Sequence, residues 1–302
     1  MRKLAVIDLG TNTFHLLIAD VHEDGSWTKV LRDRQYVSLA ESGIQRIGQA
    51  AYHRGLVCLQ QFSQLIAEHN VDIVRAFGTA ALRRASNAVS FIQEVKSITG
   101  IAIEIIQGPY EALLISKGVR QVVPFTEENS LIMDIGGGSV EFILCNQNEV
   151  FWFESFPVGV AVLYNNFHRQ EPMPESSMKA LDEYLNSKLQ SLFDNLRNIE
   201  VDRLIGASGT FDVLVKLLGQ ESYSSNYHNL DLQSFERLRQ EVICLDLDER
   251  LAMPKLPRQR AELIVVAMQL LRFILVKTGI TKMEVSSYAM KEGIIQEIIE
   301  GD

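Results

Sequence analysis

The sequence is poor in cysteine, proline and tryptophan, and it has no long apolar run. Its three cysteines, Cys58, Cys145 and Cys244, are far apart in apolar surroundings, which favours buried thiols over disulfides or metal ligands. Only four apolar residues precede Asp8, too few for the core of a signal peptide. The most apolar later stretch, 261–276, contains charged residues and is shorter than the roughly 20 apolar residues of a membrane span. We therefore expect a cytoplasmic protein without a membrane partner.

Basic residues are also fewer than acidic residues. The chain has 29 Lys and Arg against 38 Asp and Glu, a formal net charge of -9. This balance argues against nucleic acid as a partner, because broad nucleic-acid binding requires a basic face. A polyanionic ligand would have to be held by local cations, backbone amides or a metal ion.

The pattern along the chain predicts an α/β protein. The 302 residues, with 47% hydrophobic content, suffice for two domains, and strands alternate with helices on both sides of a break at 123–129. We expect domains at 1–124 and 125–302, with the C-terminal helix able to pack back on the first. The expected strands include 72–77, 103–106, 131–133, 141–145, 150–156, 204–205 and 283–286, and the expected helices 56–68, 85–98, 111–120, 177–196, 234–241 and 260–277.

Two stretches of the sequence repeat one pattern: VIDLGTNTFHLLIAD from Val6 and IMDIGGGSVEFILCN from Ile132. Each has an apolar run, an Asp, a Gly, a polar turn and a second apolar run. The corresponding residues are Asp8, Gly10, Thr11 and Thr13 in one copy and Asp134, Gly136, Gly137 and Ser139 in the other. A second pair, GTAALR from Gly78 and GASGT from Gly206, follows a short apolar strand in each half. Two related domains, each with a Gly-rich hairpin, would grip a phosphate chain from both sides.

The turn at 136–139 suits a phosphate. Glycines leave the backbone N–H groups unshielded and permit the φ angles of such a turn. Asp134, at the strand end, offers hard oxygen ligands for a divalent cation. An ordinary hairpin is the alternative, and the second copy at Asp8 argues against it.

Two further carboxylates and a pair of cations are candidates for chemistry. Glu141 lies on the strand that leaves the second turn, and Glu111 lies near the start of the expected helix at 111–120. Without a phosphate site nearby, Glu111 would be a first-turn acid favoured by the helix dipole, and Glu141 a solvated strand residue. Beside a phosphate, either could orient water or bind metal. Arg83 and Arg84 could supply cations, although one of them is expected to be solvated.

The sequence resembles the exopolyphosphatase and guanosine pentaphosphate phosphohydrolase (Ppx/GppA) family, within the actin, heat-shock chaperone and sugar kinase superfamily. The motifs that carry the resemblance are DLGTNTFHLLI, GTAALRRASN, IIQGPYEALLISKGV, DIGGGSVEFIL, FPVGVAVL, GASGT, LPRQRAELI and MKEGII. They occur in order over nearly the whole chain, which makes the match specific.

The resemblance implies two ribonuclease H-like domains with an active site in the cleft between them, and Mg²⁺-dependent removal of a terminal phosphate. It implies that Glu111 is the catalytic base, with Asp134 and Glu141 as active-site carboxylates. Asp134, Glu141 and Asp8 are the candidate metal ligands. The implied phosphate contacts are Asn12, Thr13, Arg83, Gly136, Gly137, Gly138, Ser139, Ser208, Gly209 and Thr210.

The chain departs from the family pattern at three points. Tyr110 stands where many members have another Glu, so the role of that acid does not transfer. Val140 replaces a common Thr and loses a hydroxyl. The sequence ends at Asp302, where longer members continue into a helical region that helps to bind long polyphosphate. We therefore expect the short form, acting on shorter chains or a nucleotide.

The leading hypothesis is an exopolyphosphatase that releases orthophosphate from inorganic polyphosphate. The alternative within the family is a guanosine pentaphosphate 5'-phosphohydrolase. More remote are a small-molecule kinase of the same superfamily, in which GASGT would contact adenosine, and a catalytically silent phosphate sensor. A homodimer is a family-level expectation.

Overall fold

The computed structural model describes residues 2–219 and 222–301, which form two compact units. Unit 1 comprises residues 1–118 and 290–302, and unit 2 comprises 119–289. The division falls at 118/119 instead of the expected 124, and the last helix belongs to unit 1, as the sequence allowed. Among the described residues, no helix combines the length and the apolar character that a membrane crossing requires.

Unit 1 is built on a five-stranded mixed sheet of order β3-β2-β1-β4-β5. β1 and β3 pair with β2 in antiparallel fashion, whereas β4 is parallel to β1 and to β5. Its strands are β1 (Arg2–Leu9), β2 (Thr13–Val21), β3 (Trp27–Tyr36), β4 (Ile73–Gly78) and β5 (Ile103–Ile105). Its helices are α1 (Gln49–Glu68), α2 (Ala80–Arg84), α3 (Ala88–Thr99), α4 (Gly108–Val119, up to Gly118) and α12 (Met290–Glu300).

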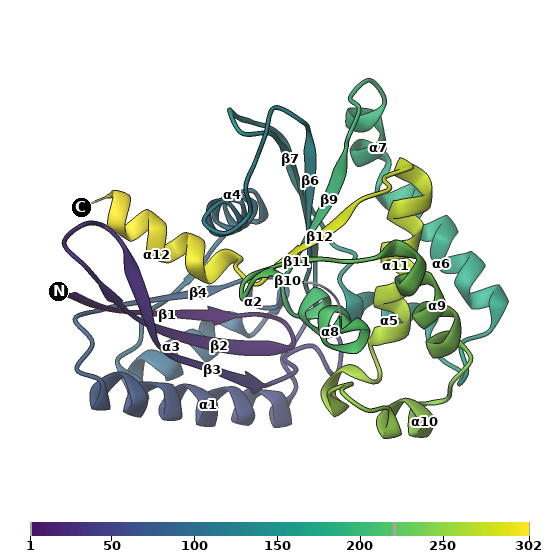
Figure 1. Ribbon diagram of the computed structural model, residues 1–302. Coiled ribbons are helices and arrows are strands. Elements are labelled where there is room, and N and C mark those ends of the chain that lie inside the picture. Colours follow the sequence, from purple (N-terminus) through teal and green to yellow (C-terminus); the bar gives the residue numbers. More distant parts are fainter. Residues whose placement is uncertain (1, 220–221, 302) are drawn as a thin grey trace. The chain divides into compact units, whose positions relative to one another are not determined.

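Helices cover both faces of this sheet. In Figure 1, α1 and α3 lie on one side of it and α12 on the other. The buried positions of α1, which include Cys58 and Phe62, recur at helical spacing and face the core. Gly55 allows α3 to approach closely, because an added Cβ would lie 2.9 Å from the Phe91 ring. The layered α/β architecture expected from the sequence is therefore present.

Unit 2 repeats the arrangement and extends it. Its seven-stranded sheet has the order β10-β11-β12-β9-β6-β7-β8, in which β8-β7-β6-β9-β12 corresponds to β3-β2-β1-β4-β5 of unit 1. The strands are β6 (Ser130–Ile135), β7 (Val140–Cys145), β8 (Val150–Phe156), β9 (Arg203–Ala207), β10 (Ser222–Ser224), β11 (Tyr227–Asn229) and β12 (Met283–Ser286). The same strand order in both units confirms that the sequence repeat is a repeat of domains.

The helices of unit 2 share one apolar core with its sheet. They are α5 (Val160–Phe167), α6 (Glu175–Lys188), α7 (Gln190–Leu196), α8 (Gly209–Leu218), α9 (Leu232–Ile243), α10 (Leu247–Ala252) and α11 (Ile264–Thr278), with a 3₁₀ turn, η1 (Arg258–Arg260). Met133, Phe142 and Leu270 lie in this core. The expected single helix at 177–196 is two helices, because Leu189 leaves the helical conformation between α6 and α7.

The cysteines match the expectation in two cases of three. Cys58 and Cys145 are buried free thiols. Burial raises the pKa of Cys58 to about 12 and that of Cys145 to about 11, so neither is a thiolate at neutral pH. Cys244 is exposed instead of buried, because it lies at the C-terminal end of α9.

Candidate active site

The sequence-predicted site residues fall into two groups, one in each unit. Unit 1 holds Asp8, Asn12, Thr13, Arg83 and Glu111. Unit 2 holds Asp134, Gly136, Gly137, Gly138, Ser139, Glu141, Ser208, Gly209 and Thr210.

The two Gly-rich hairpins have the same geometry. In unit 1 the Gly10 N–H donates to Thr13 O at 3.1 Å, and in unit 2 the Gly136 N–H donates to Ser139 O at 3.0 Å. A Cβ added to either glycine would lie 2.9 Å from that same carbonyl oxygen. Both turns therefore require glycine at their first position, which explains why the sequence repeats it.

Buried polar atoms without partners mark the first hairpin. Asn12 Nδ2 and Thr13 Oγ1 are buried and make no hydrogen bond within the described part of the chain. Buried polar atoms are nearly always hydrogen-bonded in folded proteins, so an orphaned pair indicates a missing partner. A phosphate oxygen could accept from both groups.

Asp134 and Glu141 form a carboxylate pair in unit 2. They are direct cross-strand partners on β6 and β7, so their side chains lie on the same face of the sheet. Asp134 is 5% exposed and Glu141 1%. Ser208 Oγ donates to Asp134 Oδ2 at 2.8 Å, and Ser155 Oγ donates to Glu141 Oε1 at 2.6 Å. These hydrogen bonds orient the two carboxylates.

The carboxylate pair fits a magnesium ion. Mg²⁺ is usually bound by one or two protein carboxylates, with water and substrate phosphates completing its shell. Within the described residues no group of three or more His, Cys, Asp and Glu side chains could hold a metal ion. The donor set in unit 2 therefore suits a metal shared with a phosphate ligand better than a metal enclosed by protein.

The loop after β9 completes the group in unit 2. Ser208 has a φ of 73°, a strained value for a residue other than glycine, and it precedes α8. Gly209 and Thr210 form the first turn of that helix. The exposed N–H groups at such an N-terminus favour anions, which agrees with the expected phosphate contact.

The hairpin of unit 2 has a support that the sequence reasoning did not identify. The N–H groups of Val160 and Ala161, at the start of α5, donate to Gly136 O and Gly137 O at 3.0 and 2.9 Å. A Cβ added to Gly159 would lie 2.4 Å from the Gly137 carbonyl. The motif FPVGVAVL contained the signal, since it places a glycine immediately before a helix.

Arg83 and Glu111 are paired in unit 1. Arg83 Nη1 donates to Glu111 Oε2 at 2.7 Å and to Ile106 O at 2.8 Å. Both side chains are largely buried, with 14% and 11% of their surface exposed. The sequence reasoning gave these residues separate roles and missed their contact. A guanidinium has five donors, so Arg83 can hold Glu111 and still reach a phosphate.

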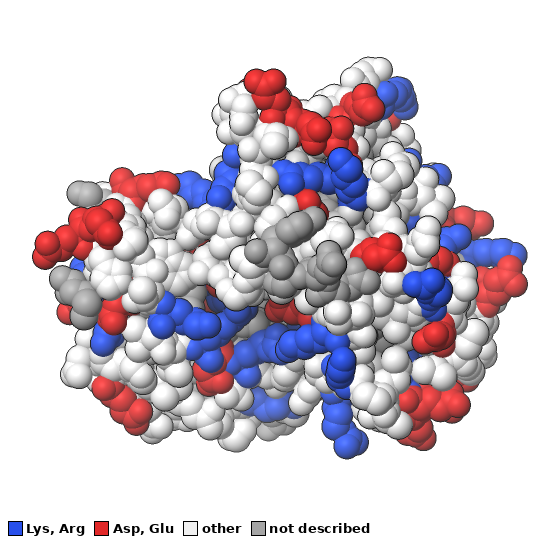
Figure 2. All heavy atoms as spheres, viewed as in Figure 1, with Lys and Arg blue, Asp and Glu red and all other residues white. Residues whose placement is uncertain are grey.

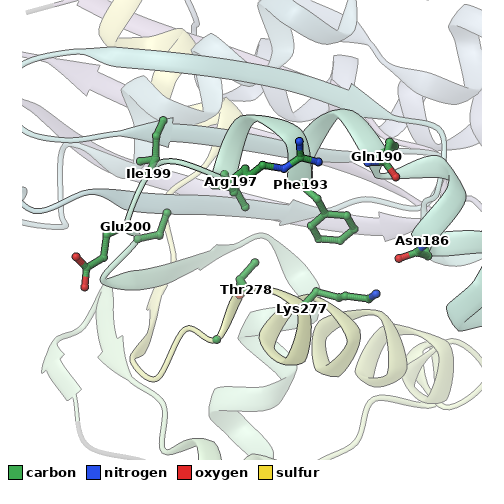
Figure 3. Close-up of a pocket in the computed structure, with 11 residues that line it drawn as sticks. Asn186, Gln190, Phe193, Arg197, Ile199, Glu200, Lys277 and Thr278 are labelled. Carbon is green, nitrogen blue, oxygen red and sulfur yellow. The ribbon is translucent and has the colours of Figure 1, made fainter.

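The surface charge and a pocket are two further features of the structure. Lys and Arg side chains gather on part of the face shown in Figure 2, although the net charge is -9. Figure 3 shows a pocket of about 490 Å³ in unit 2, with the Phe193 ring between Arg197 and Lys277. Its lining includes residues just before β9 and residues at the end of α11, ahead of β12. It therefore lies at the end of these parallel strands opposite to Ser208.

Comparison with known proteins identifies the family and the fold of the chain. A model of the Ppx/GppA phosphatase family matches residues 17–301. The fold is similar to the crystal structure of an exopolyphosphatase from Cytophaga hutchinsonii, with 37% identity, a TM-score of 0.95, and 99% and 98% of the two chains covered. A family member from Aquifex aeolicus, 24% identical, has the same fold with a TM-score of 0.81 over 100% and 99% of the chains.

Curated relatives are longer than this chain. A guanosine-5'-triphosphate,3'-diphosphate pyrophosphatase from Aeromonas hydrophila is 30% identical over 98% of this chain, and the relative from Vibrio vulnificus with the same name is 28% identical. The chain spans 59% of the length of each. Since the family model and the 37% identical structure both extend over nearly the whole chain, the protein belongs to the Ppx/GppA phosphatase family.

Proposed function

We propose that the protein is an exopolyphosphatase that hydrolyses the terminal phosphoanhydride of inorganic polyphosphate and releases orthophosphate. The observation that carries this proposal is the position of Glu111, a carboxylate fixed by Arg83 in the unit that also holds the Asn12–Thr13 turn. A protein that only binds phosphate would not require a fixed carboxylate, whereas hydrolysis requires a group that orients water.

In the proposed reaction, Glu111 accepts a proton from a water molecule. The water oxygen forms a new bond to the terminal phosphorus while the anhydride P–O bond breaks. The products are orthophosphate and a chain one phosphate shorter. The Asn12 amide, the Thr13 hydroxyl and the amides of the turn at 136–139 hold phosphate oxygens. That the two groups face a shared cleft remains a prediction.

Asp134 and Glu141 would hold Mg²⁺, and Asp8 would assist. When bound, the ion would neutralise charge on the phosphate oxygens. The two carboxylates supply hard oxygen donors on one face of the sheet, and Ser208 and Ser155 keep them oriented. A cytoplasmic location and a homodimer are further expectations for this protein.

A second candidate is guanosine pentaphosphate 5'-phosphohydrolysis. The curated relatives that carry a guanosine-phosphate name favour it, whereas the more similar crystal structure is described as an exopolyphosphatase. Both reactions break a terminal phosphoanhydride, so the same groups serve either substrate.

The test is phosphate release by the purified protein with Mg²⁺ on short polyphosphate, long polyphosphate and guanosine pentaphosphate, side by side. A higher kcat/KM on either polyphosphate supports the first candidate. A higher kcat/KM on the nucleotide supports the second. No release from any of the three contradicts both, and favours the kinase and sensor alternatives.

A further inference from the structure

Tyr110 and Glu297 join the first turn of α4 to α12 within unit 1. The Tyr110 hydroxyl donates a hydrogen bond to Glu297 Oε1. Lys117 Nζ lies 3.0 Å from Glu297 Oε2. Tyr110 and Lys117 are seven residues apart, about two helical turns, and therefore lie on one side of α4. Glu297 thus accepts hydrogen bonds from Tyr110, near the start of α4, and from Lys117, near its end.

The same side of α4 contacts the backbone of α12. A Cβ added to Gly293 would lie 1.8 Å from Leu114 O and 3.0 Å from Gly118 N. Any side chain at position 293 would collide with the backbone of α4, so glycine is required there. The two helices therefore approach each other as closely as their backbones allow. The position of α12 therefore determines where the Tyr110 side of α4 lies.

Glu111 follows Tyr110 in the same turn but points elsewhere, because successive residues of a helix are about 100° apart. Its carboxylate is held by Arg83, which also bonds Ile106 O just before the helix. Two independent contacts thus hold this turn, one through Arg83 and one through Glu297. Burial, together with the hydrogen bond to Glu297, raises the pKa of Tyr110 to about 12, so the hydroxyl remains a donor throughout the neutral range.

We propose that Tyr110 and Glu297 are positioning residues: α12 fixes the first turn of α4 through their hydrogen bond and so places the Glu111 carboxylate for reaction. The catalytic part of this inference rests on the proposed hydrolase function. A glutamate at position 110 would instead face Glu297 with like charge. Tyrosine at 110 and glutamate at 297 are therefore a matched pair in this chain.

The first test compares Tyr110→Phe, Glu297→Met and the double variant by phosphate release from short polyphosphate. Methionine has nearly the length of glutamate but no oxygen that could accept from Tyr110. Loss of the hydrogen bond in either single variant should lower kcat about tenfold while KM stays within about twofold. The double variant should be no worse than the worse single one, since Glu297→Met already removes the contact that Tyr110→Phe removes. The control is Glu300→Gln, which removes the negative charge that faces Lys117 at the surface and keeps an oxygen that can accept from Gln296; it should keep kcat within about twofold.

The second test does not depend on activity. Hydrogen exchange at the Glu111 amide, which donates to Gln107 O at 3.0 Å, reports the opening of this turn. Exchange should be several-fold faster in Tyr110→Phe and Glu297→Met at unchanged melting temperature, and unchanged in Glu300→Gln.

The outcomes separate this inference from the proposed function. Unchanged exchange, equal acceleration in the control, or additive losses of kcat would overturn the positioning role. If the wild-type protein released no phosphate at all, the hydrolase assignment would fall, and with it the catalytic part of this inference. Exchange would still decide whether Glu297 holds the turn. A Tyr110→Glu variant should lose turnover and regain part of it when Glu297→Gln is added.

Discussion

Arg83 Nη1 lies 2.7 Å from Glu111 Oε2 and 2.8 Å from the carbonyl oxygen of Ile106. One nitrogen therefore holds both the carboxylate and the backbone that leads into its helix. This double contact aligns Glu111 without a contribution from any ligand. The carboxylate is accordingly placed before substrate binds, which is the arrangement expected of a residue that orients water.

Arg83→Lys tests whether the positive charge at position 83 is enough for activity or whether the geometry of the guanidinium is needed as well. Lysine keeps the positive charge, but its shorter side chain ends in a freely rotating ammonium group instead of the planar Nη1 group, whose two N–H bonds point at the two acceptors at fixed angles. We expect kcat to fall about 10²-fold, since small displacements of a reacting group have costs of that size. The measurement is steady-state phosphate release, with Arg197→Lys as the control, because Arg197 pairs with Asp194 at the surface of unit 2. A kcat near the wild-type value would contradict the positioning role of Arg83.

Magnesium should stabilise the protein through Asp134 and Glu141. At a Mg²⁺ concentration about 100 times its Kd, ligand linkage predicts about 2.7 kcal/mol of added stability. Asp134→Asn and Glu141→Gln should each abolish the Mg²⁺-dependent rise in melting temperature, measured with and without a phosphate ligand. Asp194→Asn changes a surface carboxylate of unit 2 that pairs with Arg197, and it should retain the rise. A full Mg²⁺ response in Asp134→Asn would place the metal elsewhere.

Gly159→Ala should displace the hairpin of unit 2. The added Cβ would lie 2.4 Å from the Gly137 carbonyl, so the turn at 136–139 must shift. Overpacking of this kind typically costs about 1–3 kcal/mol of stability, and we expect KM for the phosphate substrate to rise.

Gly48→Ala provides a matched control for this variant. Gly48 also precedes a helix and has nearly the same backbone angles, −66° and 156° against −64° and 158°. There the added Cβ would meet only Ser42 Oγ, at 3.1 Å, and that hydroxyl can rotate away. Thermal unfolding and KM of the two variants should therefore differ, and equal effects would argue against the support of the hairpin by α5.

Stability should decline in acid through His168 and Glu171. Burial lowers the pKa of His168 below 6.5, although its Nε2 lies 3.2 Å from Glu171 Oε2. Burial alone would raise the pKa of Glu171, but bonds from the fully buried Arg250 lower it below 4.5. In both cases the unfolded chain binds more protons than the folded one as the pH falls. The contribution of these two groups to the free energy of unfolding is therefore complete above about pH 6.5 and declines below it.

The first part of this decline should belong to His168. His168→Gln should flatten the pH dependence of the unfolding free energy between about pH 7 and about pH 5, where histidine titrates. The exposed His53 supplies the control, and His53→Gln should leave the slope unchanged. Denaturant unfolding at several pH values measures both. An unaltered slope in His168→Gln would show that another group is responsible.

The hairpins and the alternation of strands and helices could be predicted because both depend on local sequence. The expected strand at 283–286 coincides with β12, and that at 150–156 with β8. Here apolar runs and turn residues specify the structure over a few positions. The repeated Asp–x–Gly pattern likewise predicted two turns that have the same hydrogen bond.

The remaining features depend on contacts between distant residues. Arg83 and Glu111 are 28 residues apart, and Tyr110 and Glu297 are 187 apart. No periodicity within either segment reports such a pair. The helix α8 was also not predicted. The sequence indicated a phosphate-binding turn at GASGT, but the last two residues of that motif are already the first turn of a helix. The motif FPVGVAVL places Gly159 before a helix, but the partner of that glycine, the second hairpin, becomes visible only once the chain is folded.

The measurement that tests the central claim most directly compares Glu111→Gln with the wild-type protein in Mg²⁺-dependent phosphate release and in binding of the same substrate. Glutamine keeps the size of the side chain and an oxygen that can accept from Arg83, but it cannot take a proton from water. We expect turnover to fall about 10²- to 10⁴-fold, the usual effect of losing a positioned base, while substrate affinity is retained. Turnover close to the wild-type value would contradict the assignment of Glu111 as the base.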